Sequence, residues 1–217
     1  MFDTAMARRM MVDGQVRTVD VTDLELIGAM LAVPRELFVP QNIADQAYLD
    51  CEAAIGKGRA LLKPMVIAKL IQAAQVGGTD RVLDVGCGTG YSAAVLARLA
   101  GSVVALEEDA ALARRAQDSL AAAEAASVVV ATGPLPAGWP AGAPYDVIVI
   151  DGATEIVPES LAGQLKPNGR IAAVFGRGPT GKGTIYRLVE GRLVGRPMFD
   201  AAAPVLPGFV APAAFVF

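Results

Sequence analysis

Residues 82–91 constrain the fold of this chain more than any other segment. A mostly apolar run is followed there by glycines at alternate positions, Gly86, Gly88 and Gly90. This pattern is typical of a buried strand that ends in a tight turn, where the backbone can approach a ligand closely. The apolar stretch 92–99 then predicts a helix, which would place the amides of the turn at a helix N-terminus. The segment therefore predicts a ligand site at the end of a strand.

A second apolar run, residues 103–106, ends in an acid, Glu107. In βαβ nucleotide sites a carboxylate about 20 residues beyond the glycines binds the ribose hydroxyls. Glu107 lies close to that offset, and together with the glycines it predicts a pocket for a nucleoside cofactor. An ordinary strand-to-helix turn needs one glycine for its positive φ, but it explains three glycines in so short a span poorly.

The spacing of the glycines and the charge beside them distinguish between cofactors. A dinucleotide site carries G-x-G-x-x-G, whereas Tyr91 stands here in place of the third glycine. Asp84 would put a negative charge near any pyrophosphate, and that charge favours a cationic amino-acid head group instead. The whole set resembles the S-adenosylmethionine site of Rossmann-like methyltransferases; its members are Asp84, Gly86, Cys87, Gly88, Thr89, Gly90 and Glu107. Cys87 is interpreted as a small residue of the turn rather than as a nucleophile.

The composition argues against a metal site and against a nucleic-acid partner. The chain has 217 residues, no histidine and a net charge of −3. It therefore lacks the commonest general base and metal ligand, and it gives no electrostatic reason to expect nucleic acid. Its two cysteines, Cys51 and Cys87, stand in different contexts and predict neither a disulfide framework nor a metal set. We expect a reducing, cytoplasmic setting.

No membrane partner is expected from the sequence either. Hydrophobic residues make up 53% of the chain and the mean hydropathy is +0.45, yet no stretch of about 20 uninterrupted apolar residues occurs. Residues 1–15 carry charges and no apolar core, which is unlike a signal peptide. The sequence does not indicate the oligomeric state.

Strands and helices are predicted to alternate from residue 79 onward. The predicted strands are 81–86, 102–107, 127–131 and 145–150, and the predicted helices are 91–100, 110–124 and 158–165. Such alternation implies a parallel sheet with helices on both faces. Further strands are predicted at 170–175, 184–190 and 193–199. The fold class is thus α/β: a Rossmann-like doubly wound sheet, mostly parallel with an antiparallel C-terminal edge, plus an N-terminal helical extension.

We expect residues 1–78 to form the N-terminal, substrate-side extension and residues 79–217 to form the cofactor-binding domain, in one compact unit. Residues 4–31 show helical spacing. Their predicted buried stripe is Val16, Leu24, Ile27, Met30 and Leu31. Asp20 or Thr22 is expected to cap the second helix of this region.

The remaining segments connect or close the predicted sheet. Pro64 is expected to start a helix over 65–75, and residues 134–144, rich in proline and glycine, predict a surface loop. The apolar tail 201–217 is interpreted as an edge segment that closes the sheet, with a dimer surface as the alternative.

Several motifs outside the glycine turn resemble one enzyme family. Over nearly its whole length the chain is similar to the protein-L-isoaspartate O-methyltransferases. The likeness is carried by 11–16 (MVDGQV), 33–40 (VPRELFVP), 47–50 (AYLD), 143–148 (APYDVI) and 164–170 (QLKPNGR). The VPRELFVP stretch is quite specific to that family, whereas the glycine turn is shared by many methyltransferases. The resemblance implies S-adenosylmethionine as cofactor and, as acceptor, a damaged protein or peptide with a free isoaspartyl carboxylate.

That chemistry suits a chain without histidine. A carboxylate has a pKa of about 4 and is already ionised at neutral pH. It therefore needs no base in order to attack a sulfonium methyl group, only in-line placement and the exclusion of water. No side chain is assigned a catalytic role.

The resemblance is interrupted at two places. Where the family pattern reads Gly-x-Gly-Gln-Thr-Ile-Ser-x-Pro, residues 56–64 read GKGRALLKP, with Arg59, Ala60 and Leu62 in place of glutamine, threonine and serine. Since one oriented hydroxyl at a reacting centre can be worth about 10²-fold in rate, the acceptor site is expected to diverge. Where the family has Gly-Asp-Gly, this chain has Gly133-Pro134-Leu135 and lacks the acid expected near the adenine amine. Gly133 itself stays in the predicted cofactor site.

Some residues have two interpretations each. Asp151 follows an apolar strand and either lines the floor of the cofactor pocket or caps a loop. Arg59, with Lys57 and Lys63, forms either a basic rim for an acidic acceptor or a set of solvated loop charges. Trp139 either covers the adenine or packs within its own loop.

Three other functions are weighed against the protein methyltransferase. A relative that binds S-adenosylmethionine as a regulatory or binding module, without methylating isoaspartate, is favoured by Ala60, Leu62 and Pro134. An amino methyltransferase acting on nucleic acid would carry an Asn/Asp-Pro-Pro-Tyr type of segment, which residues 151–154 do not match. A nicotinamide oxidoreductase is disfavoured by Asp84 and Tyr91.

Overall fold

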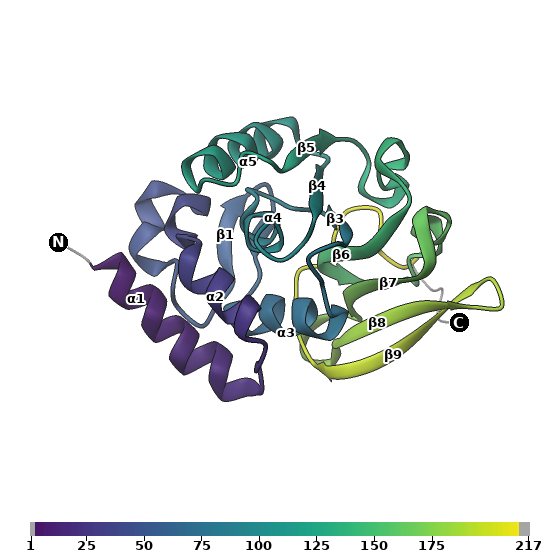
Figure 1. The fold of residues 1–217 in the computed structure, drawn as a ribbon, viewed down its shortest axis with the longest axis horizontal. Coiled ribbons are helices and arrows are strands. Elements are labelled where there is room, and N and C mark those ends of the chain that lie inside the picture. Colours follow the sequence, from purple (N-terminus) through teal and green to yellow (C-terminus); the bar gives the residue numbers. More distant parts are fainter. Residues whose placement is uncertain (1–2, 213–217) are drawn as a thin grey trace.

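A seven-stranded sheet forms the centre of the molecule (Figure 1). The computed structural model describes residues 3–212, and the strand order is β5-β4-β3-β6-β7-β8-β9. The strands are β3 (Arg81–Val85), β4 (Ser102–Glu107), β5 (Val129–Thr132), β6 (Tyr145–Thr154), β7 (Leu165–Phe175), β8 (Lys182–Val189) and β9 (Arg192–Asp200). The first five run parallel, and β8 and β9 are antiparallel to their neighbours. The predicted fold class is confirmed.

The order of the strands determines where a ligand can bind. β3 pairs with β4 on one side and with β6 on the other, so the chain reverses its direction of travel across the sheet at β3. In open α/β sheets the crevice at the carboxyl ends of the strands around such a switch point is the ligand site. The glycine turn follows β3 directly, as predicted.

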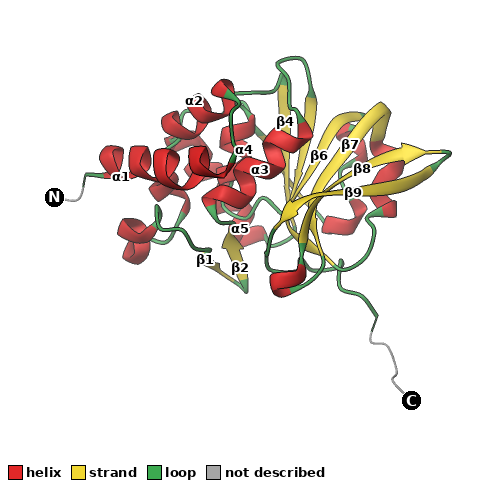
Figure 2. Cartoon of the chain, turned by 90° about the horizontal axis from the view of Figure 1, so that it is seen from below, coloured by secondary structure: helices red, strands yellow, loops and turns green. Residues whose placement is uncertain are grey.

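The two faces of the sheet are covered differently. The helices α3 (Pro64–Ala74), α4 (Tyr91–Leu96) and α5 (Ala110–Ala122) belong to the same apolar core as the N-terminal helices, and Figure 2 shows them together on one side of the sheet. The core on the other face is built from short 3₁₀ segments and the tail. The helix predicted at 158–165 is a 3₁₀ helix, Glu159–Gln164. The crossover there is short and contains Gly163, a weak helix former, so the other face of the sheet is covered by 3₁₀ helices, and the prediction of an α-helix at 158–165 was wrong.

The N-terminal region is helical, as predicted, with two corrections. It contains α1 (Thr4–Met11), a π-helical turn (Val12–Val16), a 3₁₀ turn (Arg17–Val19) and α2 (Leu24–Ala32). The cap of α2 is Asp23, whose Oδ1 accepts hydrogen bonds from the amides of Glu25 and Leu26, so neither Asp20 nor Thr22 is the cap. Leu24 begins the helix with 75% of its surface exposed, in contrast to the buried Val16, Ile27 and Met30.

A small hairpin between α2 and α3 was not predicted. It consists of β1 (Ala53–Gly56) and β2 (Arg59–Leu61), which pair only with each other, and Figure 2 shows it apart from the main sheet. Its turn residues Lys57 and Gly58 have φ values of 56° and 70°. Two positive φ angles are typical of a two-residue hairpin turn, which usually carries asparagine or glycine first. The lysine at that position obscured the signal.

The tail follows another path than the one predicted. Val205 forms a parallel bridge with Ala153, and the amide of Leu206 donates to the Ala153 carbonyl at 2.9 Å. The segment thus crosses the carboxyl end of β6, in the interior of the sheet, and does not lie along the β9 edge. Leu206 and Phe209 are buried, while residues 213–217 of the predicted tail lie outside the described residues.

Most predicted element boundaries shift by a few residues. The strand predicted at 127–131 is Val129–Thr132, the strand predicted at 145–150 extends to Thr154, and the helix predicted at 91–100 ends at Leu96. No helix within residues 3–212 is long and apolar enough to cross a bilayer.

Candidate functional site

The three glycines of the turn all have positive φ, but they serve different contacts. The values are 77° at Gly86, 57° at Gly88 and 95° at Gly90. A β-carbon on Gly90 would meet Leu120 of α5, and one on Gly88 would lie 2.5 Å from Ile55 of β1. These two glycines therefore allow close packing of protein on protein. Gly86 is the glycine of the three that borders the predicted cofactor cleft.

The side chains of Cys87 and Thr89 face the protein. Cys87 is fully buried, and burial raises the pKa of its thiol well above the ordinary value, which agrees with its interpretation as a small turn residue. The Thr89 hydroxyl donates to the Phe38 carbonyl, within the VPRELFVP stretch. Neither side chain is exposed to a ligand in this structure.

Glu107 ends β4 beside the glycine turn and is fully buried. Its Oε2 accepts a hydrogen bond from the Gly88 amide at 2.8 Å. Its Oε1 accepts hydrogen bonds from the amides of Glu108 and Asp109 and from Arg59 Nη1 at 3.0 Å. The predicted carboxylate is therefore held rigidly at the switch point.

Arg59 is buried, which contradicts both interpretations of it. Its side chain is 8% exposed and pairs with the fully buried Glu107, so it is neither part of a basic rim nor a solvated loop charge. Nη2 of Arg59 also donates to the Gly86 carbonyl at 2.7 Å. The hairpin turns this side chain inward, because the residues on the same face of β1 and β2, Ala53, Ile55 and Leu61, are buried as well. Lys57 stays exposed.

Asp84, Ser92 and Asp151 form a buried polar cluster beneath the glycine turn. Ser92 Oγ lies 2.6 Å from Asp84 Oδ2 and 2.8 Å from Asp151 Oδ2. A hydroxyl has one hydrogen to donate, so the second contact requires a proton on a carboxyl group. Burial raises the pKa of Asp151 to about 6, and burial together with the charge of Asp151 raises the pKa of Asp84. Asp151 lies within β6, and its Oδ2 contacts the Ser92 hydroxyl rather than a loop amide, which disfavours a loop cap.

A buried arginine connects the VPRELFVP stretch to Tyr91, the first residue of α4. Arg35 is fully buried, donates to the carbonyls of Ala47 and Leu62, and lies 4.5 Å from the centre of the Tyr91 ring. Phe38 meets the same ring edge-on at 5.7 Å. Sequence reasoning assigned no role to Arg35 or Ser92; the motif around Arg35 was the available signal.

Gly133 follows β5 at the same edge of the sheet. Its amide donates to the Glu107 carbonyl at 3.2 Å, and a hollow of about 440 Å³ is lined by Gly133, Pro134, Glu108 and Asp109. The backbone of Trp139 makes two hydrogen bonds: its amide donates to Gln164 and its carbonyl accepts from Tyr145. These are backbone contacts, and the indole ring itself lies near both Gly142 of the loop and Gly133, so both interpretations of Trp139 stay predictions.

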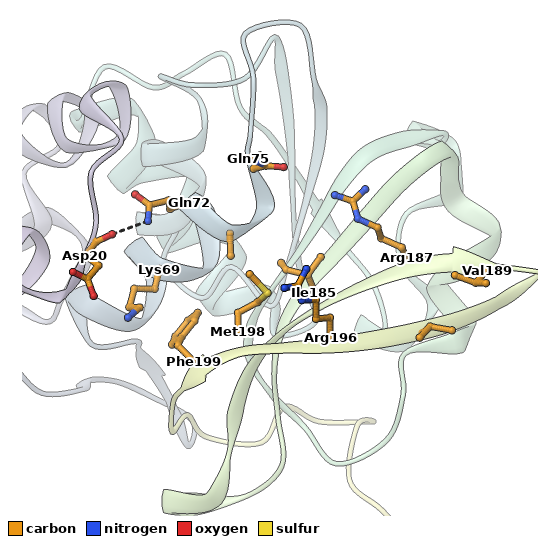
Figure 3. A pocket seen from close by; sticks show the side chains of 12 residues that line it. Asp20, Lys69, Gln72, Gln75, Ile185, Arg187, Val189, Arg196, Met198 and Phe199 are labelled. Atoms are coloured by element: carbon orange, nitrogen blue, oxygen red, sulfur yellow. Dashed lines mark hydrogen bonds between the residues drawn. The ribbon is translucent and has the colours of Figure 1, made fainter.

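A wider groove lies away from all of these residues. It measures about 660 Å³ and separates the C-terminal half of α3 from the face of the β8–β9 hairpin (Figure 3). Lys69, Ile185, Arg196 and Phe199 are among its lining residues, and none of the predicted site residues is. It is a separate surface feature.

The acceptors at the switch point fit a ligand that combines ribose hydroxyls with cationic groups. Asp84, Glu107 and Asp151 lie on the neighbouring strands β3, β4 and β6, at or near their carboxyl ends. Oδ1 of Asp84 and Oδ1 of Asp151 are buried without a hydrogen-bond partner among residues 3–212. Since buried polar atoms are rarely left unpartnered, these oxygens suit the donors of a bound ligand. S-adenosylmethionine offers hydroxyls, an ammonium and a sulfonium.

The mostly parallel sheet, the acid before the glycine turn and the acid that ends β4 define a class I S-adenosylmethionine-dependent methyltransferase. The sequence model of the protein-L-isoaspartate(D-aspartate) O-methyltransferase (PCMT) family matches residues 7–186. The chain belongs to this family. The predicted family, enzyme class and cofactor are confirmed.

Individual relatives support the same assignment. The protein-L-isoaspartate O-methyltransferase of Methylorubrum extorquens is 42% identical over 199 residues, which is 92% of this chain and 85% of that protein. The Pelotomaculum thermopropionicum enzyme of the same name is 40% identical over 169 residues, covering 78% and 74%. A Plasmodium falciparum protein of the PCMT type, solved with S-adenosyl-L-homocysteine, matches with a TM-score of 0.78 and 16% identity over 92% of this chain and 97% of that one. At that identity the likeness supports the fold alone.

Proposed function

We propose that this protein transfers a methyl group from S-adenosylmethionine to the free carboxylate of isoaspartyl residues in damaged proteins. One observation carries the proposal: the chain matches the family over residues 7–186, with a relative 42% identical over 92% of its length. The predicted divergence of residues 56–64 from the family pattern stays a prediction.

The cofactor would be held by the acceptors at the switch point. We propose that Glu107 binds the ribose hydroxyls, that the backbone of residues 86–90 and Gly133 lines the cleft, and that Asp84 and Asp151 face the cationic part. When bound, S-adenosylmethionine supplies an electrophilic methyl group on a positively charged sulfur. A buried cluster of carboxylates stabilises a positive charge more strongly than water-exposed carboxylates do, because the local dielectric is low.

The acceptor requires little from the protein beyond placement. An isoaspartyl carboxylate is ionised at neutral pH, which agrees with a chain that contains no histidine. The buried Arg35 and Tyr91 fix the VPRELFVP stretch against the glycine turn. We infer that this stretch helps to orient the acceptor relative to the cofactor, since small errors in placement reduce the rates of such transfers strongly.

Two further proposals concern the surroundings of the protein. We infer that its partners are proteins or peptides that carry an isoaspartyl group. We also infer that it works in the cytoplasm, where its two free cysteines, the exposed Cys51 and the buried Cys87, stay reduced.

The test is methyl transfer from labelled S-adenosylmethionine to a peptide that contains one isoaspartyl residue. The same peptide with a normal aspartyl residue is the matched control, because the two are isomers that differ only in which carboxyl group of that residue forms the peptide bond and which is free. Labelling of the isoaspartyl peptide alone is the expected result. If neither peptide is labelled although calorimetry shows that the cofactor binds, the chain is a binding module and the proposed activity is wrong.

A further inference from the structure

One side chain of the protein occupies the acceptors that the cofactor is expected to use. Arg59 extends from β2 into the crevice at the switch point, where Nη1 contacts Glu107 and Nη2 contacts the Gly86 carbonyl. Glu107 is the strand-end carboxylate, and Gly86 opens the glycine turn. By the general rule for nucleotide sites in α/β folds, these two positions belong to the ligand.

Oε1 of Glu107 already accepts three hydrogen bonds, one of them from Arg59. It accepts from the amides of Gly88, Glu108 and Asp109 and from the guanidinium of Arg59. A carboxylate offers about two acceptor positions on each oxygen, so Oε1 has no position left for a ligand, whereas Oε2 accepts only from the Gly88 amide. The three amides are fixed by the turn and by the end of β4, so Arg59 is the donor that can leave. A ribose that binds both oxygens of Glu107 through its two hydroxyls can do so only after Arg59 has left Oε1.

The space above Gly86 is filled as well. A β-carbon on Gly86 would lie 2.7 Å from Leu206 Cδ1, 2.9 Å from Arg59 Nη2 and 3.5 Å from Leu135 Cδ1. Leu206 belongs to the tail that crosses β6 and also packs on Gly152. The guanidinium is therefore enclosed between the glycine turn and the tail.

Stability alone does not account for this ion pair. Arg59 and Glu107 are 8% and 0% exposed, and the attraction between two charges buried to this degree is largely offset by their desolvation. A charged pair in a ligand cleft is better explained by exchange with a ligand. The planar guanidinium offers donors and a positive charge, as a cofactor with hydroxyl and ammonium groups does.

We propose that Arg59 is an internal competitor of the cofactor: its guanidinium closes the ligand-free cleft and must leave Glu107 and Gly86 before the cofactor binds. The inference rests on the proposed function in so far as the ligand is S-adenosylmethionine or its product. The apparent dissociation constant is then the intrinsic constant divided by the fraction of molecules in which Arg59 has moved away.

The test is calorimetric titration of Arg59→Gln with S-adenosylhomocysteine. S-adenosylhomocysteine lacks the sulfonium charge. Removing a positive charge from the protein therefore does not by itself strengthen the electrostatic attraction between the protein and this probe. We expect Kd to fall about tenfold, which corresponds to about 1.4 kcal/mol. Lys57→Gln is the matched control: it removes a positive charge from the same hairpin at an exposed position, and its Kd should equal that of the wild type.

Thermal unfolding provides a second readout. The ligand-free Arg59→Gln variant should melt at a lower temperature than the wild type, because Glu107 is left buried without its partner, while its rise in melting temperature with the probe should be larger. A purely structural arginine would lower the melting temperature without tightening the Kd. An unchanged or weaker affinity would overturn the proposal.

Arg59→Lys keeps the test decisive if the glutamine variant does not fold. Lysine retains the charge beside Glu107 but lacks the fork that reaches two acceptors at once, so its Kd should fall between those of the wild type and the glutamine variant. A Kd equal to or weaker than that of the wild type would again overturn the proposal. Neither titration depends on turnover. If the variants bind the probe more tightly but the protein does not methylate the isoaspartyl peptide, only the proposed function is refuted. If the protein methylates the peptide but the variants do not bind the probe more tightly, only this inference is refuted.

Discussion

We expect the wild-type protein to lose stability as pH rises because of Asp151, and we expect the Asp151→Asn variant not to show this loss. Burial raises the pKa of Asp151 from 3.8 to about 6. Between these values the folded protein holds a proton that the unfolded chain releases. The favourable contribution of this proton is fully present below about pH 4 and is lost as pH rises through 6.

The magnitude follows from the two pKa values. A difference between 3.8 and about 6 corresponds to about 3 kcal/mol of unfolding free energy. The amide introduced by Asp151→Asn does not titrate, and it can donate to Ser92 Oγ, which then donates to Asp84. Since the wild type has already lost part of this contribution at pH 4, the stability of the variant relative to the wild type should increase by about 2 kcal/mol from pH 4 to pH 7.

Urea unfolding at pH 4, 5, 6 and 7 measures this difference directly. All other titrating groups are shared by the two proteins, so subtraction isolates the Asp84–Ser92–Asp151 cluster. Asp45→Asn, at an exposed position, is the control and should run parallel to the wild type. Parallel curves for Asp151→Asn as well would refute the argument that burial keeps a proton in this cluster.

Three further substitutions test other parts of the site. Glu107→Ala should weaken binding of S-adenosylmethionine by about 1–3 kcal/mol in calorimetry if its carboxylate holds the ribose; an unchanged Kd would contradict that role. Gly88→Ala should lower the unfolding free energy by more than about 1 kcal/mol, since φ is 57° and the new carbon would lie 2.5 Å from Ile55. Gly14→Ala, with open space around it, should not lower it by that much. Equal effects of the two substitutions would disprove the packing argument. Leu206→Ala should cost about 2–5 kcal/mol in urea unfolding because the side chain is buried, and the exposed Val210→Ala should cost less than about 0.5 kcal/mol. A Leu206→Ala variant as stable as the wild type would mean that the tail does not pack on the sheet.

The parts of the site that lie within one strand–turn–helix unit were predictable from sequence. The glycine turn follows β3, and Glu107 ends β4, as the predicted strands 81–86 and 102–107 require. Local alternation of apolar strands and helical segments determines this geometry, because parallel strands place their carboxyl ends at one edge of the sheet. Asp151 was placed at the same edge for the same reason.

The contacts that close the site were not predictable, because they join segments far apart in the chain. Arg59 meets Glu107 across 48 positions, and nothing in the residues around Arg59 indicates a buried partner. The same holds for Leu206, which reaches Gly86 from the tail. The crossover at 158–165 was misjudged because apolar spacing does not separate a short 3₁₀ helix from an α-helix.

The path of the tail across β6 has a consequence for the order of synthesis. The ribosome produces the glycine turn and Glu107 long before it produces Leu206. A nascent chain that has already formed the parallel strands still lacks the side chain that covers Gly86, since protein chains begin to fold from their N-terminal part. The side chain that covers Gly86 therefore becomes available only after all seven strands of the sheet have been synthesised, when the tail can dock onto Ala153.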